Sequence, residues 1–223
     1  MLSQMETVAR YIDYTLLKPE AVPADIVRLC EEAQRYRFAT VCVNSGYVEL
    51  AVQKLAGTGV GVCSVVGFPL GACLTQVKAA EAKAAVQAGA SELDMVMNIG
   101  LFKAQDYERV RADIQAVVAE AAGRVVKVII ETGLLTAVEK KTATELVIEA
   151  GAHFVKTSTG FLGGGATKED VELLAQVARG RIGVKASGGI RSFKQAMALI
   201  AAGATRLGTS AGVAIVNEEK VQT

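Results

Sequence analysis

Residues 150–157, Ala-Gly-Ala-His-Phe-Val-Lys-Thr, join the end of a helical pattern to a short apolar strand. The same Ala-Gly-Ala step recurs at residues 88–90 and 202–204, each time between a helical stretch and a predicted strand. Glycine at that point suits the left-handed turn that ends many helices. The steps are unevenly spaced along the chain, so they indicate a recurring helix-to-strand unit and not a solenoid repeat.

The alternation of strand and helix extends along the whole sequence. Short β-branched runs predict eight strands, at residues 10–15, 39–43, 60–66, 92–97, 125–131, 153–157, 183–186 and 205–209. Helical periodicity predicts helices at residues 23–36, 45–54, 74–87, 106–121, 137–150, 168–178 and 192–201. Residues 125–130, Val-Val-Lys-Val-Ile-Ile, lack strict alternation, which is typical of parallel strands covered on both faces.

Eight β/α units within 223 residues predict a single α/β domain, residues 1–223, folded as a closed (β/α)8 TIM barrel. An open, doubly wound sheet is the competing architecture. We disfavour it because no Gly-x-Gly-x-x-Gly fingerprint follows a predicted strand. The glycines at positions 57, 59 and 61 precede a strand instead.

Composition narrows the classes of function. With 24 basic and 23 acidic residues the formal charge is +1. This near-neutral charge argues against a protein that binds nucleic acid through attraction of basic residues to the phosphate backbone. No apolar run reaches the ~18 residues of a membrane span, and residues 1–14 lack the apolar core of a signal peptide, so we expect a cytoplasmic protein. The lone His153 excludes a histidine metal cluster and leaves no obvious Ser-His-Asp triad, and the four cysteines lack zinc-binding spacing. We therefore expect no metal, and reduced, buried cysteines.

Two lysines and one aspartate interrupt apolar strands near the ends that form barrel active sites: Lys156, Lys185 and Asp94. Burial and a neighbouring cation lower the pKa of a lysine, and a neutral lysine can attack a carbonyl to form a Schiff base. The alternatives are a lysine that reaches solvent or a purely structural ion pair with Asp94. Lys127 and Glu131, on one strand, are expected to hold these charges in register. The residues alone do not decide which lysine is the nucleophile.

Glycine-rich turns follow the last two predicted strands. Gly188-Gly189 precedes a helix, and Gly208-Thr209-Ser210 opens a short one. Turns at these positions bind phosphate in many barrels through backbone N–H groups and helix N-termini, although tight turns without a ligand are the alternative. Thr159 and Gly160, just after Lys156, add a hydroxyl and a flexible backbone beside the proposed nucleophile.

Six segments, in order, resemble the deoxyribose-phosphate aldolase family. They are residues 12–19 (Ile-Asp-Tyr-Thr-Leu-Leu-Lys-Pro), 67–71 (Gly-Phe-Pro-Leu-Gly), 92–96 (Glu-Leu-Asp-Met-Val), 127–132 (Lys-Val-Ile-Ile-Glu-Thr), 155–161 (Val-Lys-Thr-Ser-Thr-Gly-Phe) and 184–190 (Val-Lys-Ala-Ser-Gly-Gly-Ile). The resemblance implies that Lys156 forms the Schiff base and that Asp94 and Lys185 donate and accept protons. It places residues 160, 188–189 and 208–210 around the phosphate, Thr15 near the substrate hydroxyls, and Cys42 near the site without a required role.

The reaction implied by this resemblance is the reversible cleavage of 2-deoxy-D-ribose 5-phosphate to D-glyceraldehyde 3-phosphate and acetaldehyde, without a cofactor or metal. Small phosphorylated substrates and a homo-oligomeric state, dimer or tetramer, are also implied. One departure is visible, because the family usually has histidine where this sequence has Tyr14. We expect Tyr14 to change the surroundings of the site and not to abolish activity.

Two other functions remain open. A phosphate-binding barrel isomerase or synthase without an imine would use Asp94 and Glu131 as its acid and base. A non-catalytic binding barrel is the third possibility, and the cost of burying three charges without a use argues against it.

Overall fold

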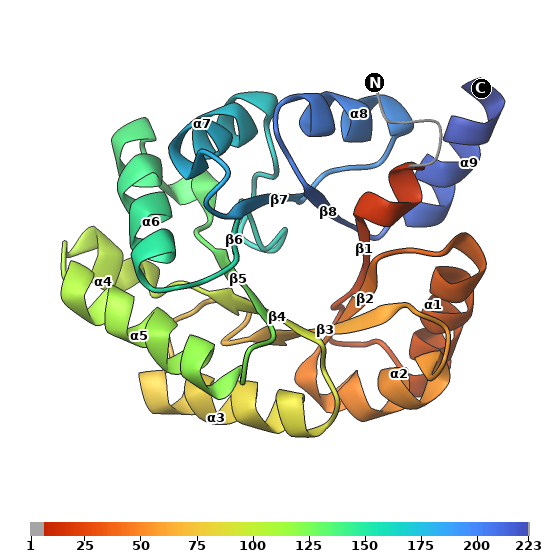
Figure 1. Cartoon of the computed structure of the whole chain (residues 1–223), viewed down its shortest axis with the longest axis horizontal. Helices are drawn as coiled ribbons and strands as arrows, with labels where there is room; N and C mark the ends of the chain where they lie inside the picture. Colours follow the sequence, from red (N-terminus) through yellow and green to blue (C-terminus); the bar gives the residue numbers. More distant parts are fainter. Residues whose placement is uncertain (1–6, 223) are drawn as a thin grey trace.

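The computed structural model describes residues 7–222, in which eight parallel strands close into a barrel through pairing of the first strand with the eighth (Figure 1). The strands are β1 (Ile12–Leu16), β2 (Thr40–Val43), β3 (Gly61–Val66), β4 (Glu92–Val96), β5 (Val125–Ile129), β6 (Phe154–Lys156), β7 (Gly183–Ser187) and β8 (Arg206–Thr209). The predicted (β/α)8 TIM barrel is confirmed, and the strands follow one another around it in chain order.

Helices form a ring outside the strands (Figure 1). They are α1 (Pro23–Tyr36), α2 (Val48–Leu55), α3 (Thr75–Gln87), α4 (Ile99–Lys103), α5 (Tyr107–Glu120), α6 (Ala137–Glu149), α7 (Lys168–Ala178), α8 (Phe193–Ala201) and α9 (Gly212–Gln222), with 3-10 turns η1 (Val8–Tyr11), η2 (Ser45–Tyr47) and η3 (Thr132–Leu134). None of these helices is long and apolar enough to cross a membrane. Residues 1–6 of the amino-terminal stretch considered above lie outside the described residues.

The Ala-Gly-Ala steps make the predicted left-handed turns. Gly89, Gly151 and Gly203 have φ of +101°, +80° and +111°, a backbone region that costs an L-residue roughly 1–2 kcal/mol. Each turn ends a helix and returns the chain to the start of the next strand.

Several elements differ from the sequence prediction. β1 begins at Ile12 instead of residue 10, because residues 8–11 form η1. The five-residue helix α4 was not predicted, since it is too short to show helical periodicity; its signal is Asn98, whose side chain accepts the N–H of Leu101. The last helix is longer than expected, with 11 residues.

The main hydrophobic core lies between the barrel and the helices. On β5, Val126 and Val128 belong to this core, whereas Lys127 between them faces the barrel interior. A small apolar cluster of Leu17, Cys42, Cys63 and Val65 lies apart from the main core, with Phe68 packed against it. Most of the remaining interior is filled by ionised side chains. The helices thus supply the apolar burial that leaves the barrel interior free for charges.

Close packing at one Ala-Gly-Ala step gives a stability prediction. A Cβ on Gly203 would lie 2.6 Å from Cβ of Ala175 in α7, whereas one on Gly151 would meet nothing within 4 Å. We expect Gly203→Ala to lower the free energy of unfolding by about 2–4 kcal/mol, from backbone strain and overpacking together. Gly151→Ala should cost only about 1–2 kcal/mol, from strain alone. Urea denaturation of both variants measures the difference. Equal losses of unfolding free energy in the two variants would show that close packing at Gly203 makes no contribution.

Candidate active site

Asp94, in the middle of β4, binds the amino groups of three lysines inside the barrel. Its Oδ1 lies 2.8 Å from Nζ of Lys127, and its Oδ2 lies 2.7 Å from both Lys156 Nζ and Lys185 Nζ. All four side chains are buried. Burial disfavours the carboxylate, but the attraction of the three lysines holds the pKa of Asp94 well below its usual range. The structure therefore brings together the three predicted catalytic residues.

The two candidate nucleophiles differ in their surroundings. Lys185 is fully buried and binds two carboxylates, Asp94 and Asp13. Lys156 has one carboxylate partner, Asp94, and Lys156 also lines a pocket. Only Lys156 of the two is therefore placed to meet a substrate.

The expected lowering of the lysine pKa is wrong for Lys185. Burial lowers the pKa of Lys185, but the attraction of Asp13 and Asp94 outweighs burial and raises it above the ordinary value. The pKa of Lys127 is raised in the same way, mainly by Asp94. Both lysines are thus held as ammonium ions, which suits them to donate a proton and not to attack a carbonyl.

The prediction that Lys127 and Glu131 share one supporting role is correct for Lys127 alone. Glu131 lies beyond the end of β5 with left-handed backbone, at φ +52°. Its carboxylate accepts the hydroxyl of Thr159 at 2.5 Å and the Thr159 N–H at 3.1 Å. Glu131 therefore anchors the loop that follows Lys156. It does not join the charge cluster, which is built around Asp94 and its three lysines.

Three charged residues of the cluster were not found from the sequence. Asp13 on β1 binds Lys185, and it lies 2.7 Å from Arg206 Nη1. Glu92, the first residue of β4, lies 2.5 Å from Lys127 Nζ. Despite burial, Lys185, Lys127 and Arg206 lower the pKa of Asp13. Their sequence signal is a charged residue two positions before a site residue on the same strand: Glu92 before Asp94, Asp13 before Thr15 and Arg206 before Gly208.

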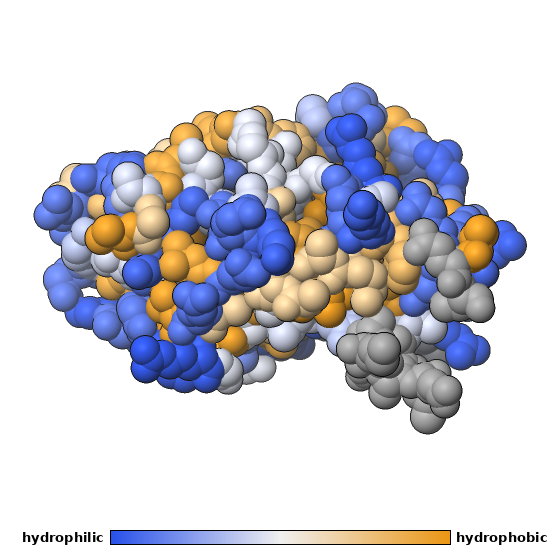
Figure 2. Space-filling view, turned by 90° about the horizontal axis from the view of Figure 1, so that it is seen from above, coloured by the Kyte–Doolittle hydropathy of each residue, from blue (hydrophilic) through white to orange (hydrophobic). Residues whose placement is uncertain are grey.

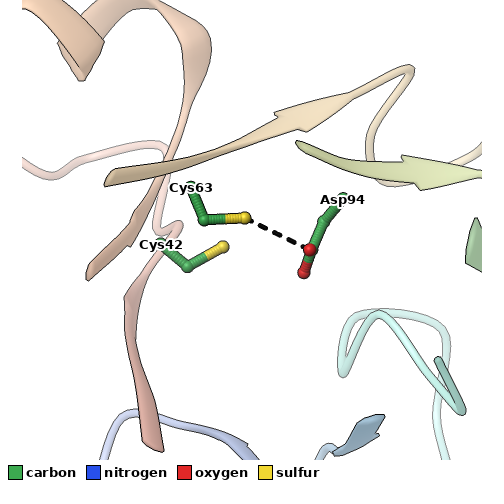
Figure 3. A group of neighbouring side chains, drawn as sticks. All are labelled: Cys42, Cys63 and Asp94. Carbon is green, nitrogen blue, oxygen red and sulfur yellow. Dashed lines mark hydrogen bonds between the residues drawn. The ribbon is translucent and has the colours of Figure 1, made fainter. Parts of the chain in front are cut away.

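Two thiols lie beside Asp94 on the neighbouring strands (Figure 3). Cys63 Sγ donates to Asp94 Oδ1 at 3.1 Å, and Cys42 is its partner in the β2–β3 register. The cysteine and carboxylate ligand atoms lie within 4.8 Å of one another. Both oxygens of Asp94 already bind ammonium groups, so a metal cation here would add charge to an excess of buried cations. The cluster does not fit a metal site.

A pocket of about 300 Å³ opens above Lys156 at the carboxyl ends of the strands. Eight further predicted residues line it: Thr15, Thr159, Gly160, Gly188, Gly189, Gly208, Thr209 and Ser210. Three predicted residues do not line it: Asp94 and Lys185, which are fully buried beside Lys156, and Cys42, whose side chain is buried in the small apolar cluster. Lys18 and Arg191 also line the pocket and were not predicted. A wider groove of about 700 Å³ between α5, α6 and α7 contains none of the predicted residues.

Glycine shapes the far side of the pocket. Gly188 has φ +90°, and a Cβ on Gly165 would lie 2.4 Å from the carbonyl oxygen of Gly188. This approach brings the loop after β6 against the turn after β7. Turns of this kind present backbone N–H groups, the ordinary ligands of a phosphate.

Comparison with known proteins places this arrangement in a family. The family model described as "DeoC/LacD family aldolase" matches residues 7–218. The chain belongs to this aldolase family. Deoxyribose-phosphate aldolase of Halalkalibacterium halodurans is 57% identical over 216 residues, covering 96% of each chain, and that of Bacillus subtilis is 54% identical with the same coverage. A solved structure, the tetrameric deoxyribose phosphate aldolase of Aeropyrum pernix, superposes with a TM-score of 0.91 at 37% identity, covering 97% of this chain and 92% of that one.

Tyr14, the departure from the aldolase family, faces away from the pocket. Its ring packs against Phe38 with centroids 5.0 Å apart, and its hydroxyl donates to Glu32 Oε2 at 2.6 Å. Burial, followed by this hydrogen bond, raises the pKa of Tyr14 above its ordinary value. The substitution therefore lies between the barrel and α1, outside the charge cluster.

We expect Tyr14→Phe to lower the free energy of unfolding by about 1–3 kcal/mol, because Glu32 loses its donor. The value of kcat should change less than twofold, since the hydroxyl does not reach the pocket. Urea denaturation and steady-state kinetics, with Tyr14→His as the comparison, measure both quantities. A collapse of kcat in Tyr14→Phe alone would show that the hydroxyl participates in catalysis.

Asp94→Asn tests the charge cluster. Removing the carboxylate leaves three buried lysines without their shared partner, two of them, Lys127 and Lys185, held as ammonium ions, which should cost about 3–5 kcal/mol at pH 7. Lys127 and Lys185 have raised pKa values, so their ion pairs stabilise the fold below the ordinary lysine pKa of ~10.5 and lose that contribution as pH rises through the folded value. The gap between wild type and variant should therefore narrow above about pH 10.5.

Urea midpoints from pH 7 to 11 measure this gap. Glu139→Gln is the matched control, because Glu139 forms an exposed ion pair with Lys103 outside the barrel and its loss should hardly move the midpoint. An Asp94→Asn midpoint as high as that of the control would contradict the role of Asp94.

Proposed function

We propose that the protein is a class I aldolase that reversibly cleaves 2-deoxy-D-ribose 5-phosphate to D-glyceraldehyde 3-phosphate and acetaldehyde, with Lys156 as the Schiff-base residue. The observation that carries the proposal is the unequal pair of lysines on Asp94. One is fixed as an ammonium ion by two carboxylates, and the other reaches the pocket. Membership of the aldolase family and the names of its relatives, deoxyribose-phosphate aldolases, support the substrate.

The first step joins Lys156 to the aldehyde. The neutral amine attacks C1 of the open-chain sugar, and the C1 oxygen takes up a proton to give a carbinolamine. Loss of that oxygen as water leaves a protonated imine. Asp94 Oδ2, 2.7 Å from Lys156 Nζ, accepts the proton that the amine must lose, and the Lys185 ammonium on the same oxygen can supply one to the leaving hydroxyl.

The second step breaks the C2–C3 bond. The C3 hydroxyl passes its proton to Lys185, which gave one up in the first step. The C3 oxygen becomes the aldehyde of glyceraldehyde 3-phosphate, and the electrons of the C2–C3 bond move into the imine to form an enamine on Lys156. The enamine carbon then takes a proton through Lys185 and Asp94, and water hydrolyses the imine to release acetaldehyde. Proton transfers by placed groups contribute about 10²–10⁴-fold each. These reaction steps need neither a metal nor an organic cofactor.

The glycine turns hold the phosphate far from the reacting carbons. Residues 160, 188–189 and 208–210 provide backbone N–H groups and hydroxyls at the mouth of the pocket, and Arg191 adds a positive charge. Thr15 lies at the end of β1, on the same pocket, where it can meet the sugar hydroxyls. Binding energy from a remote phosphate positions C1 at the amine of Lys156.

The isomerase alternative is not favoured by the geometry. It requires Asp94 and Glu131 to act as an acid and base pair, but both oxygens of Asp94 bind lysines. Glu131 binds Thr159 and forms no ion pair with a described residue. Neither carboxylate is free to move a substrate proton directly.

The proposal assigns residues 1–223 to one catalytic domain that acts in the cytoplasm on small phosphorylated sugars. The proposal also includes self-association of the chain into a dimer or a tetramer, which the tetrameric relative from Aeropyrum pernix supports. The face that includes α7 and α8 carries apolar surface between clusters of hydrophilic side chains (Figure 2). Light scattering after gel filtration measures the oligomeric state.

Borohydride trapping tests the imine. Folded protein incubated with acetaldehyde and reduced with borohydride should carry an N-ethyl group on Lys156, located by peptide mass mapping. Lys156→Arg should show no adduct and should lose at least 10³-fold in kcat, because a guanidinium cannot form the imine. The same adduct on Lys185 would keep the aldolase and exchange the roles of the lysines. No adduct on either lysine would end the Schiff-base proposal.

A further inference from the structure

Glu92 and Arg206 form an ion pair at the end of the barrel opposite the pocket. They are the first residues of β4 and β8, whereas the pocket is lined from the last residues of the strands onward. Arg206 Nη1 lies 2.9 Å from Glu92 Oε2, and the guanidinium lies 5.5 Å from the ring centroid of Phe154. The side chains are only 16% and 13% exposed. The Glu92–Arg206 pair is thus built into the barrel and not a surface contact.

Two unbroken chains of ion pairs connect this pair to Lys156. One runs from Glu92 through Lys127 to Asp94, with steps of 2.5 and 2.8 Å, and on to Lys156 at 2.7 Å. The other runs from Arg206 through Asp13 and Lys185 to the same oxygen of Asp94. Charges linked through a buried interior are screened far less than exposed charges.

The charges of the barrel interior almost balance. Among the described residues, four cations and three carboxylates form the two chains: Lys127, Lys156, Lys185, Arg206, Asp13, Glu92 and Asp94. With the three carboxylates ionised and Lys127, Lys185 and Arg206 protonated, the cluster is neutral only when Lys156 is a neutral amine. The neutral amine is the form that attacks a carbonyl.

We propose that Glu92 and Arg206, at the far end of the barrel, act on the protonation of Lys156 in opposite directions through the two chains, so that their effects cancel in the intact pair and the loss of either charge alone shifts it. This inference rests on the proposed function, since it gives Lys156 the role of nucleophile. Both residues are positioning residues, because neither touches the pocket. Arg206 disfavours a proton on Lys156, and Glu92 favours one.

Other titratable groups facing the cluster do not enter this balance as formal charges. Burial raises the pKa of the Cys63 thiol on β3, which donates to Asp94. A hydrogen bond with Cys63 lowers the pKa of Cys42 on β2, which the balance counts as a neutral thiol. Glu131, beyond β5, is bound by Thr159. Lys18 and Arg191, after β1 and β7, are exposed at the pocket mouth, where water and salt screen them.

Removing the charge of Arg206 and removing the charge of Glu92 should shift the acid limb of the pH profile in opposite directions. We expect Arg206→Gln to move the acid limb of the pH profile of kcat/KM upward by about one pH unit, the effect of a unit charge about 10 Å away at an effective dielectric constant of about 20. Glu92→Gln should move the limb downward by a similar amount, and the double variant should return it close to the wild-type position. Arg206→Lys keeps the charge and should keep the limb. On the acid limb, one unit corresponds to about a tenfold change in kcat/KM.

Glu139→Gln, which removes the same charge from an exposed ion pair outside the barrel, is the matched control and should not move the limb. Limbs that stay in place, or that move in the same direction in both single variants, would overturn the inference. If Arg206→Gln does not fold, the downward shift in Glu92→Gln decides alone. Borohydride trapping on wild-type Lys156 separates the two proposals: trapping without limb shifts contradicts only the charge balance, and no trapping contradicts the proposed function.

Discussion

A carboxylate shared by three buried lysine amino groups is the interaction on which the site depends. Asp94 can remain ionised inside the barrel because Lys127, Lys156 and Lys185 surround it, and the lysines can remain buried because Asp94, Asp13 and Glu92 offset them. A buried charge without a partner costs several kcal/mol. The cluster therefore forms as a unit, and its members cannot be assigned separable energies.

The barrel supplies the register that this unit requires. Asp94 lies opposite Lys127 across β4 and β5, and Lys156 opposite Lys185 across β6 and β7. Closure of the sheet brings β1 beside β8, which places Asp13 next to Lys185 although 172 residues separate them in sequence. An open sheet with the same strands would leave Lys185 without its second carboxylate. The two lysines would then be nearly equivalent, so the closed topology itself distinguishes the proposed acid, Lys185, from the proposed nucleophile, Lys156.

The role of barrel closure in bringing distant charges together explains which residues of the site could be predicted from the sequence. Lys156, Lys185 and Asp94 interrupt apolar strands, and the glycine turns follow strands, so both were visible as local patterns and in a family resemblance. Asp13, Glu92 and Arg206 escaped because a charge near the start of a strand is also typical of an exposed strand end. The raised pKa of Lys185 escaped because it depends on a partner that only barrel closure brings near. Glu131 was misassigned because its left-handed backbone turns it toward Thr159, away from the cluster expected from strand alternation.

In the proposed reaction the substrate brings its own charge, and the pocket separates that charge from the amine. A phosphate dianion held beside Lys156 would stabilise the ammonium form and oppose attack on the aldehyde. Backbone N–H groups of the glycine turns and the exposed Arg191 can offset the phosphate at the mouth. Asp94 and the residues behind it balance the lysines inside the barrel. In this proposed reaction, one charge balance at the pocket mouth serves the phosphate, and a separate one inside the barrel serves the lysines.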